Sequence, residues 1–230
     1  TLVSGRPLVD GRAMPWLYTP AVDDVDLAGW GREQRSRLQC ELLQSGALLF
    51  RGFALKTVQD FESVAQAFCG ELFGEYGDLP REKSGRHVYG STPYPPDKPI
   101  LFHNESSHMH RWPQKQFFFC LQAAQEGGQT PIVDGRLMFK GLRTDLRERL
   151  REKQLMYVRN FVPGVDVSWQ DFFRTSDKAE VEALCAKNGM DWQWLEKGGL
   201  RTKQVCPAII EHPDTGESVF FNQIQLHHVS

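Results

Sequence analysis

The chain has 230 residues, 27 of them basic and 29 acidic, and a formal net charge of −2. Hydrophobic residues make up 40% and charged residues 24% of it, a composition that builds a core and argues against a disordered chain. The near-neutral charge gives no electrostatic reason to bind nucleic acid or a membrane surface, and no apolar run approaches the roughly 18 residues of a membrane span. The five cysteines are well separated and form no CxxC pair, which predicts a reducing, cytoplasmic environment rather than disulfides or a zinc ribbon.

Prolines and glycines are frequent in residues 1–30, which predicts an irregular N-terminal arm ahead of a single domain at 31–230. The apolar run 46–53 lies between glycines and is typical of a buried strand. Thr57 has Asp60 three positions later and apolar residues at helical spacing after it. A capped helix is therefore predicted there, ending at the next glycine.

The middle of the chain predicts a long loop followed by strands. Residues 71–99 are rich in Gly, Pro, Tyr and charge, and a loop of this length in a compact domain is usually a lid or a binding segment. Apolar residues predict strands at 100–104 and 115–123, and the paired glycines within 126–130 predict a turn.

Helices and strands alternate in the second half. Asp134 is placed to cap a helix, residues 154–161 alternate like a strand, and Asp177 is placed to begin another helix. Residues 200–211 and 217–222 flank a turn sequence and predict a hairpin. Because strands dominate and helices lie between them, the order favours a mainly β protein with flanking helices over a regular βαβ sheet.

Metal-binding side chains are most concentrated in the segment Phe102-His-Asn-Glu-Ser-Ser-His-Met-His110. On an extended segment His103 and Glu105 project from the same face. One His, one carboxylate and a more distant His form an open-sided Fe(II) site. An H-x-E triplet by itself is weak evidence, because it arises by chance in many proteins and then consists of surface or packing residues. His108 and His110 are candidates either for contact with a substrate or for polar residues where the strand ends.

The sequence after this triplet resembles the taurine dioxygenase/clavaminate synthase (TauD/TfdA-like) superfamily of Fe(II)- and 2-oxoglutarate-dependent oxygenases. In that family an H-x-D/E motif is followed by a strand and a Gly-Gly-x-Thr-Pro turn, as in Phe117–Leu121 and Gly127–Asp134 here. The chain is most similar to the branch of the syringomycin aspartyl β-hydroxylase, which has Glu in the triplet. Further landmarks are residues 46–53, Tyr76–Leu79, Trp112-Pro113, His212–Glu217 and Phe221-Asn-Gln223.

The resemblance implies a double-stranded β-helix (jelly-roll) with the metal at the mouth of the barrel. It implies that His103, Glu105 and a distal His bind Fe(II) and that Thr130 binds a carboxylate of 2-oxoglutarate. Reaction with O₂ would then hydroxylate an unactivated C–H bond of an amino acid or small acid, free or tethered to a carrier protein, in natural-product biosynthesis. The carboxylate at Glu105 argues against the related halogenases.

The family's distal His and the following Arg lie on late strands, and the sequence given ends at Ser230. We expect the distal His beyond this residue, together with the last barrel strands. The alternative is that His227 or His228 replaces it.

Three further residues are substrate-site candidates, each with an ordinary structural alternative. Tyr94 could line a pocket or pack within its loop, and Asn222 and Gln223 could orient a substrate or act as hydrogen-bonded strand amides. Two other functions stay open: an inactive cupin-like binding protein and a zinc-dependent hydrolase using the same His/Glu pair. The expected partner is a small-molecule or carrier-bound substrate, not nucleic acid or membrane. Substrate identity and oligomeric state carry no sequence signal.

Overall fold

The computed structural model describes residues 1–73, 85–90, 100–109, 112–164 and 167–227. Tyr94, His110 and His228 lie outside the described residues, as does most of the predicted loop at 71–99. The chain divides into two compact units, which are described separately here. The described part of the first unit is 1–73, 85–90 and 115–134, and the rest belongs to the second. The single domain expected at 31–230 stays a prediction.

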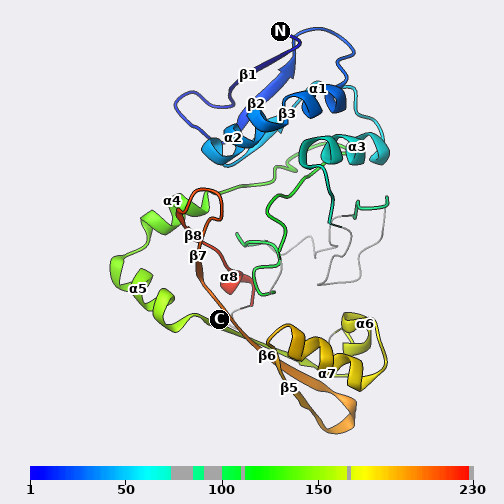
Figure 1. The fold of residues 1–230 in the computed structure, drawn as a ribbon, viewed down its shortest axis with the longest axis vertical. Coiled ribbons are helices and arrows are strands. Elements are labelled where there is room, and N and C mark those ends of the chain that lie inside the picture. Colours follow the sequence, from blue (N-terminus) through cyan, green and yellow to red (C-terminus); the bar gives the residue numbers. More distant parts are fainter. Residues whose placement is uncertain (74–84, 91–99, 110–111, 165–166, 228–230) are drawn as a thin grey trace. The chain divides into compact units, whose positions relative to one another are not determined.

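The first unit contains a three-stranded sheet of order β1–β2–β3 (Figure 1). β1 (Val3–Pro7) pairs antiparallel with β2 (Trp16–Pro20), and β2 pairs parallel with β3 (Leu48–Phe50). The prediction of an irregular arm was therefore wrong. Two prolines of the arm stand at the last positions of β1 and β2, where a missing N–H is tolerated.

Aromatic packing holds the helices of this unit against the sheet. The helices are α1 (Leu27–Glu33), α2 (Arg35–Ser45) and α3 (Val58–Cys69). Tyr18 is 1% exposed, and its ring stacks on Phe50 at 5.2 Å between centroids. Phe50 in turn contacts Phe68 of α3 at 5.0 Å. The buried strand expected within 46–53 is thus present as β3, with partly buried side chains.

The predicted cap of α3 is confirmed. The Asp60 N–H donates to Thr57 Oγ1 at 3.1 Å, and the Thr57 N–H donates to Asp60 Oδ2 at 2.9 Å. The side chain of each residue thus accepts the main-chain N–H of the other at the start of the helix. These hydrogen bonds lower the pKa of Asp60, and the largest cause is the bond from the Lys56 main-chain N–H. The helix ends at Gly70, whose φ of +85° favours glycine.

The predicted strand at 115–123 does not form among the described residues, although its alternation is present. Phe117 and Phe119 turn towards α3, where Phe119 stacks on Phe61 at 5.2 Å, while Phe118 is 78% exposed. A strand is defined by ladder hydrogen bonds to a partner, and this segment is held by ring contacts instead. Residues 100–104 likewise carry no strand.

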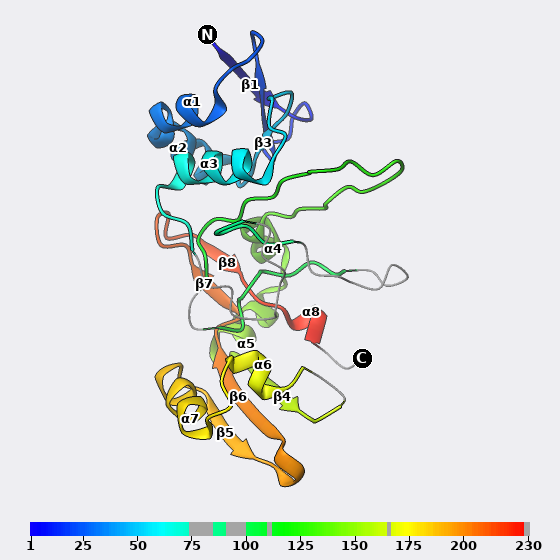
Figure 2. The same cartoon turned by 90° about the vertical axis from the view of Figure 1, so that its right-hand side faces the viewer.

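The second unit is built on a three-stranded antiparallel sheet of order β4–β6–β5 (Figure 2). Its strands are β4 (Leu155–Phe161), β5 (Asp191–Trp194) and β6 (Leu200–Cys206), so the strand expected at 154–161 is confirmed. Two helices accompany it, α6 (Trp169–Phe173) and α7 (Lys178–Lys187), the latter capped by Asp177 as predicted. The core consists of the buried residues Phe161, Trp169, Val181, Cys185 and Leu200. Burial raises the pKa of the Cys185 thiol to about 11, so this thiol stays protonated near neutral pH.

The predicted hairpin forms, but only the last residues of its first strand take part in it. β7 (Ile209–Glu211) pairs antiparallel with β8 (Ser218–Phe220), whereas β6 pairs with β4 and β5. Pro207 lies between β6 and β7 and has no N–H to continue a ladder. The helix expected after Asp134 is divided into α4 (Gly135–Gly141) and α5 (Thr144–Lys153) by the extended Arg143.

Within the described residues, the strands form two three-stranded sheets and one two-stranded sheet, and no closed jelly-roll is visible. The described residues contain helices and small sheets, and the mainly β jelly-roll expected from the sequence stays a prediction. None of the described helices combines the length and apolar character that a membrane crossing requires.

Candidate functional site

His103 and Glu105 approach each other in the second unit. His103 Nε2 lies 3.7 Å from Glu105 Oε2, and the two side chains are 26% and 19% exposed. A divalent ion lies about 2.1 Å from nitrogen and oxygen ligands, so one ion can contact both atoms when they are less than about 4.2 Å apart. The pair is thus close enough to contact one ion, and a small approach of the two side chains would give the roughly 3.0 Å of adjacent octahedral ligands. A turn begins at Glu105, so the extended geometry assumed from the sequence stops before it, although the two side chains still converge.

A main-chain contact fixes the orientation of the imidazole. His103 Nδ1 lies 2.8 Å from the Leu101 carbonyl oxygen, which can only accept a hydrogen bond. Nδ1 therefore carries a proton, and in a neutral imidazole Nε2 is the nitrogen whose lone pair faces Glu105. Metal-binding histidines commonly have this arrangement, in which the outer nitrogen donates to a carbonyl or carboxylate.

Burial raises the pKa of Glu105, and the nearby His108 opposes this shift. A carboxylate in this setting is favoured by a cation beside it. Within the described residues, no third His, Cys, Asp or Glu completes a metal-binding group. The main chain of His227 lies in α8 (Ile224–His227), and His228 is outside the described part, so the distal ligand stays a prediction.

Asn222 and Gln223 are buried beside Asn104 and the turn that begins at Glu105. The Asn222 N–H donates to Asn104 Oδ1 at 3.2 Å, and Gln223 Nε2 donates to the Asn104 carbonyl at 2.9 Å. The Asn222 side chain is also engaged, because its Nδ2 donates to the Ala208 carbonyl. The Asn222 main chain and the Gln223 side chain therefore support the turn, as the structural alternative expects, and contact with a substrate stays a prediction.

Two residues of this arrangement were missed from the sequence. Asn104 was considered only as the variable residue of the H-x-E triplet, and Tyr157 only as one residue of a strand. The Tyr157 hydroxyl accepts the Gln223 N–H at 3.0 Å. Burial raises the pKa of Tyr157, while the hydrogen bonds from Gln223 and Ser107 oppose this shift. The inward side of the alternating strand β4 was the available signal for Tyr157.

Thr130 lies in the first unit on an exposed segment without regular secondary structure. Within the turn predicted before it, φ is +67° at Gly127 and +76° at Gly128, values that favour glycine. A Cβ on Gly128 would also come within 2.7 Å of Ala124 Cβ, so this position requires glycine. The hydroxyl is accessible to a ligand, and its role in binding 2-oxoglutarate stays a prediction.

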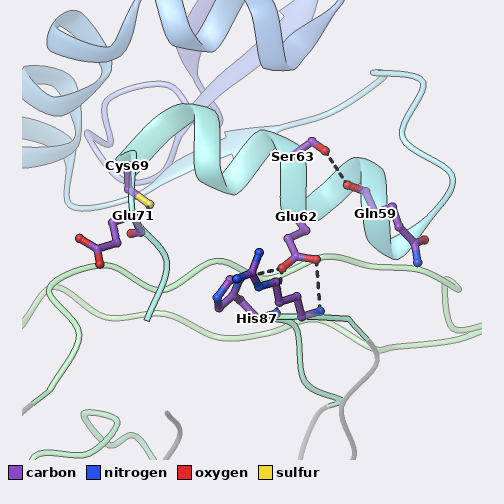
Figure 3. Close-up of polar contacts among 7 residues, drawn as sticks. Gln59, Glu62, Ser63, Cys69, Glu71 and His87 are labelled. Carbon is purple, nitrogen blue, oxygen red and sulfur yellow. Dashed lines mark hydrogen bonds and ion pairs between the residues drawn. The ribbon is translucent and has the colours of Figure 1, made fainter. Parts of the chain in front are cut away.

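The described residues 85–90 of the predicted loop are attached to α3 by one carboxylate (Figure 3). Glu62 Oε1 accepts the main-chain N–H of His87 at 2.8 Å and lies 2.9 Å from its Nδ1. Glu62 Oε2 accepts the Arg86 N–H at 3.3 Å. The side chains of Glu62 and His87 are 17% and 26% exposed, so water competes only partly for these bonds.

Replacing this carboxylate is expected to release the segment from α3. In Glu62→Ala the amides of Arg86 and His87 should exchange with deuterium about 10- to 100-fold faster, because hydrogen bonds to a charged group contribute roughly 1.5–3 kcal/mol. Gln59→Ala, on the exposed side of the same helix, is the control and should leave these amides unchanged. Equal exchange in both variants would show that other contacts hold the segment.

A family model described as taurine catabolism dioxygenase TauD, TfdA family matches residues 10–228. The chain therefore belongs to the TauD/TfdA family. Proteins of this family depend on Fe(II), 2-oxoglutarate and O₂, and the family implies a jelly-roll fold. A His/Glu pair with its imidazole held by a carbonyl agrees with that metal requirement.

Two similar proteins extend the comparison. The dapdiamide synthesis protein DdaC of Enterobacter agglomerans is 35% identical over 226 residues, which is 98% of this chain and 68% of DdaC. A clavaminate synthase-like protein of Arabidopsis thaliana is 33% identical over 204 residues, 84% of this chain and 62% of its own length. The chain thus spans about two thirds of each relative.

Proposed function

We propose that this protein is a 2-oxoglutarate-dependent non-haem iron hydroxylase, acting on an unactivated C–H bond of an amino acid or small acid. The observation that carries the proposal is the His103–Glu105 pair, whose facing atoms are 3.7 Å apart and whose imidazole presents Nε2. The family match supports the same reading.

Each residue has a separate part in this proposal. His103 and Glu105 would hold Fe(II) from one side, leaving positions open for 2-oxoglutarate and O₂. The Thr130 hydroxyl would donate a hydrogen bond to a carboxylate of 2-oxoglutarate. When bound, the iron supplies the oxidative decarboxylation of 2-oxoglutarate and the insertion of oxygen into the substrate. The chain itself supplies ligand geometry and orientation.

The substrate class rests on the relatives. DdaC is named for dapdiamide synthesis, which supports a role in natural-product biosynthesis. We infer an amino acid or small acid, either free or loaded on a carrier protein, as in the syringomycin-type branch. The inactive cupin-like protein is less well supported, because it gives no reason for an oriented imidazole facing a carboxylate. A zinc hydrolase would use the same pair but would not require 2-oxoglutarate.

Anaerobic addition of Fe(II) and 2-oxoglutarate to the protein tests the proposal. We expect a weak visible charge-transfer band that requires both additions, followed by succinate formation once O₂ and substrate are admitted. Free amino acids and the same residues loaded on a carrier domain are offered in parallel, and a mass gain of one oxygen is measured. A protein that binds Zn(II) but gives neither the band nor succinate would contradict the proposal.

A further inference from the structure

The residue between the two proposed metal ligands is tied to a segment far along the chain. The Asn104 N–H donates to the Asn222 carbonyl at 3.1 Å, and the Asn222 N–H donates to Asn104 Oδ1 at 3.2 Å. Asn104 and Asn222 are therefore joined by two hydrogen bonds, one in each direction, and in the second the acceptor is the Asn104 side chain. Any displacement of Asn104 moves both of its neighbours, His103 and Glu105.

The Asn104 carbonyl is held from two further directions. It accepts the Ser107 hydroxyl at 2.8 Å and Gln223 Nε2 at 2.9 Å. Ser107 is 1% exposed and Gln223 is 5% exposed, so these bonds are shielded from water. Hydrogen bonds in such a setting are costly to leave unsatisfied and therefore fix the turn.

The supporting segment is itself anchored to the sheet of the second unit. Asn222 Nδ2 donates to the Ala208 carbonyl at 3.2 Å, and Asn222 Oδ1 accepts the N–H of Ile224, the first residue of α8. The Gln223 N–H donates to the hydroxyl of Tyr157 on β4 at 3.0 Å. These bonds link the turn to the sheet by way of residues 222–224.

We propose that Asn104, Asn222 and Gln223 form a positioning clasp that sets the separation and orientation of His103 and Glu105 for metal binding. The inference rests on the proposed function, since it assumes that these two residues are ligands. In this proposal the clasp residues act on the metal ligands through the turn and are not ligands themselves. Loss of groups that orient metal ligands typically costs 10–100-fold in metal affinity.

Gln223→Met tests the clasp, because it removes one donor to Asn104 and keeps the length of the side chain. Anaerobic titration with Co(II) alone should give an apparent dissociation constant about 10–100-fold above that of the unmodified protein. The Co(II) d–d bands should also shift, since ligand geometry changes. Tyr157→Phe removes the acceptor of the Gln223 N–H and should change both readouts in the same direction, which provides a second variant if the first fails to fold.

Asn188→Leu is the matched control. It also removes a side-chain amide that donates to a main-chain carbonyl. Asn188 Nδ2 donates to the Leu184 carbonyl at 2.9 Å, at the end of α7. Its Co(II) affinity and spectrum should equal those of the unmodified protein. A Gln223→Met protein with unchanged affinity and spectrum, even if its melting temperature falls, overturns the clasp.

His103→Ala distinguishes a failure of the clasp from a failure of the proposed metal site. If it abolishes Co(II) binding while Gln223→Met does not change it, the metal site stands and the clasp fails. If Co(II) binding is absent from the unmodified protein or unaffected by His103→Ala, the proposed function itself fails.

Discussion

Iron binding should be lost in both His103→Ala and Glu105→Ala. Each change removes one of the two described ligands, whose facing atoms are 3.7 Å apart, and leaves the ion only the other ligand and the expected distal His. In Glu105→Ala the carboxylate charge is lost as well, and in His103→Ala the oriented Nε2 disappears. Elemental analysis of protein reconstituted anaerobically with Fe(II) gives the measurement. We expect bound iron in the unmodified protein and only background iron in either variant.

The chain contains a suitable control for this experiment. His87 and Glu62 also form an imidazole–carboxylate pair, at 2.9 Å, but in the first unit and with Nδ1 towards the carboxylate. His87→Ala should keep its iron. Near-stoichiometric iron in His103→Ala and Glu105→Ala would remove both residues from the metal site, whatever the control shows.

Local signals in the sequence were sufficient for several elements. The cap of α3 needs only Thr57 and Asp60, three positions apart, and the structure has both of their hydrogen bonds. The start of α7 at Asp177 is equally local, because the side chain accepts the N–H of Ala179. The positive φ values at Gly127 and Gly128 likewise follow from the backbone freedom of glycine.

Elements that depend on distant partners could not be predicted in this way. β2 pairs over five residues with β1, inside the predicted arm, and over three with β3, which follows two helices. Proline content alone indicated an irregular arm, since it contains no information about either pairing. The opposite error occurred at Phe117–Phe119, where an alternating pattern packs against α3 without a ladder partner among the described residues.

The candidate site shows the same division. His103 and Glu105 are two positions apart, so their convergence could be anticipated from the sequence. The bridge from Asn104 to Asn222 joins residues 118 positions apart, and no periodicity indicates it. Asn222 and Gln223 were candidates for either substrate contact or structural hydrogen bonds, and the bonds that the structure shows are structural.

Thr130→Val should weaken 2-oxoglutarate binding by about one to two orders of magnitude. Valine keeps the shape of the side chain and removes the hydroxyl, and a hydrogen bond to a charged carboxylate contributes roughly 1.5–3 kcal/mol. The fold should not change, because Thr130 is exposed and the preceding turn depends on Gly127 and Gly128. Titration of the Fe(II)-loaded protein with 2-oxoglutarate, followed by the visible band, gives the affinity.

Thr130→Ser separates the hydroxyl from the methyl group. Serine keeps the donor, so this variant should bind 2-oxoglutarate within a few-fold of the unmodified protein, whereas valine should not. The affinity for substrate should change much less than that for 2-oxoglutarate, because the hydroxyl is proposed to contact only the latter. If the valine protein titrates like the unmodified one, the carboxylate of 2-oxoglutarate is bound elsewhere, and the His103–Glu105 metal site is unaffected by that result.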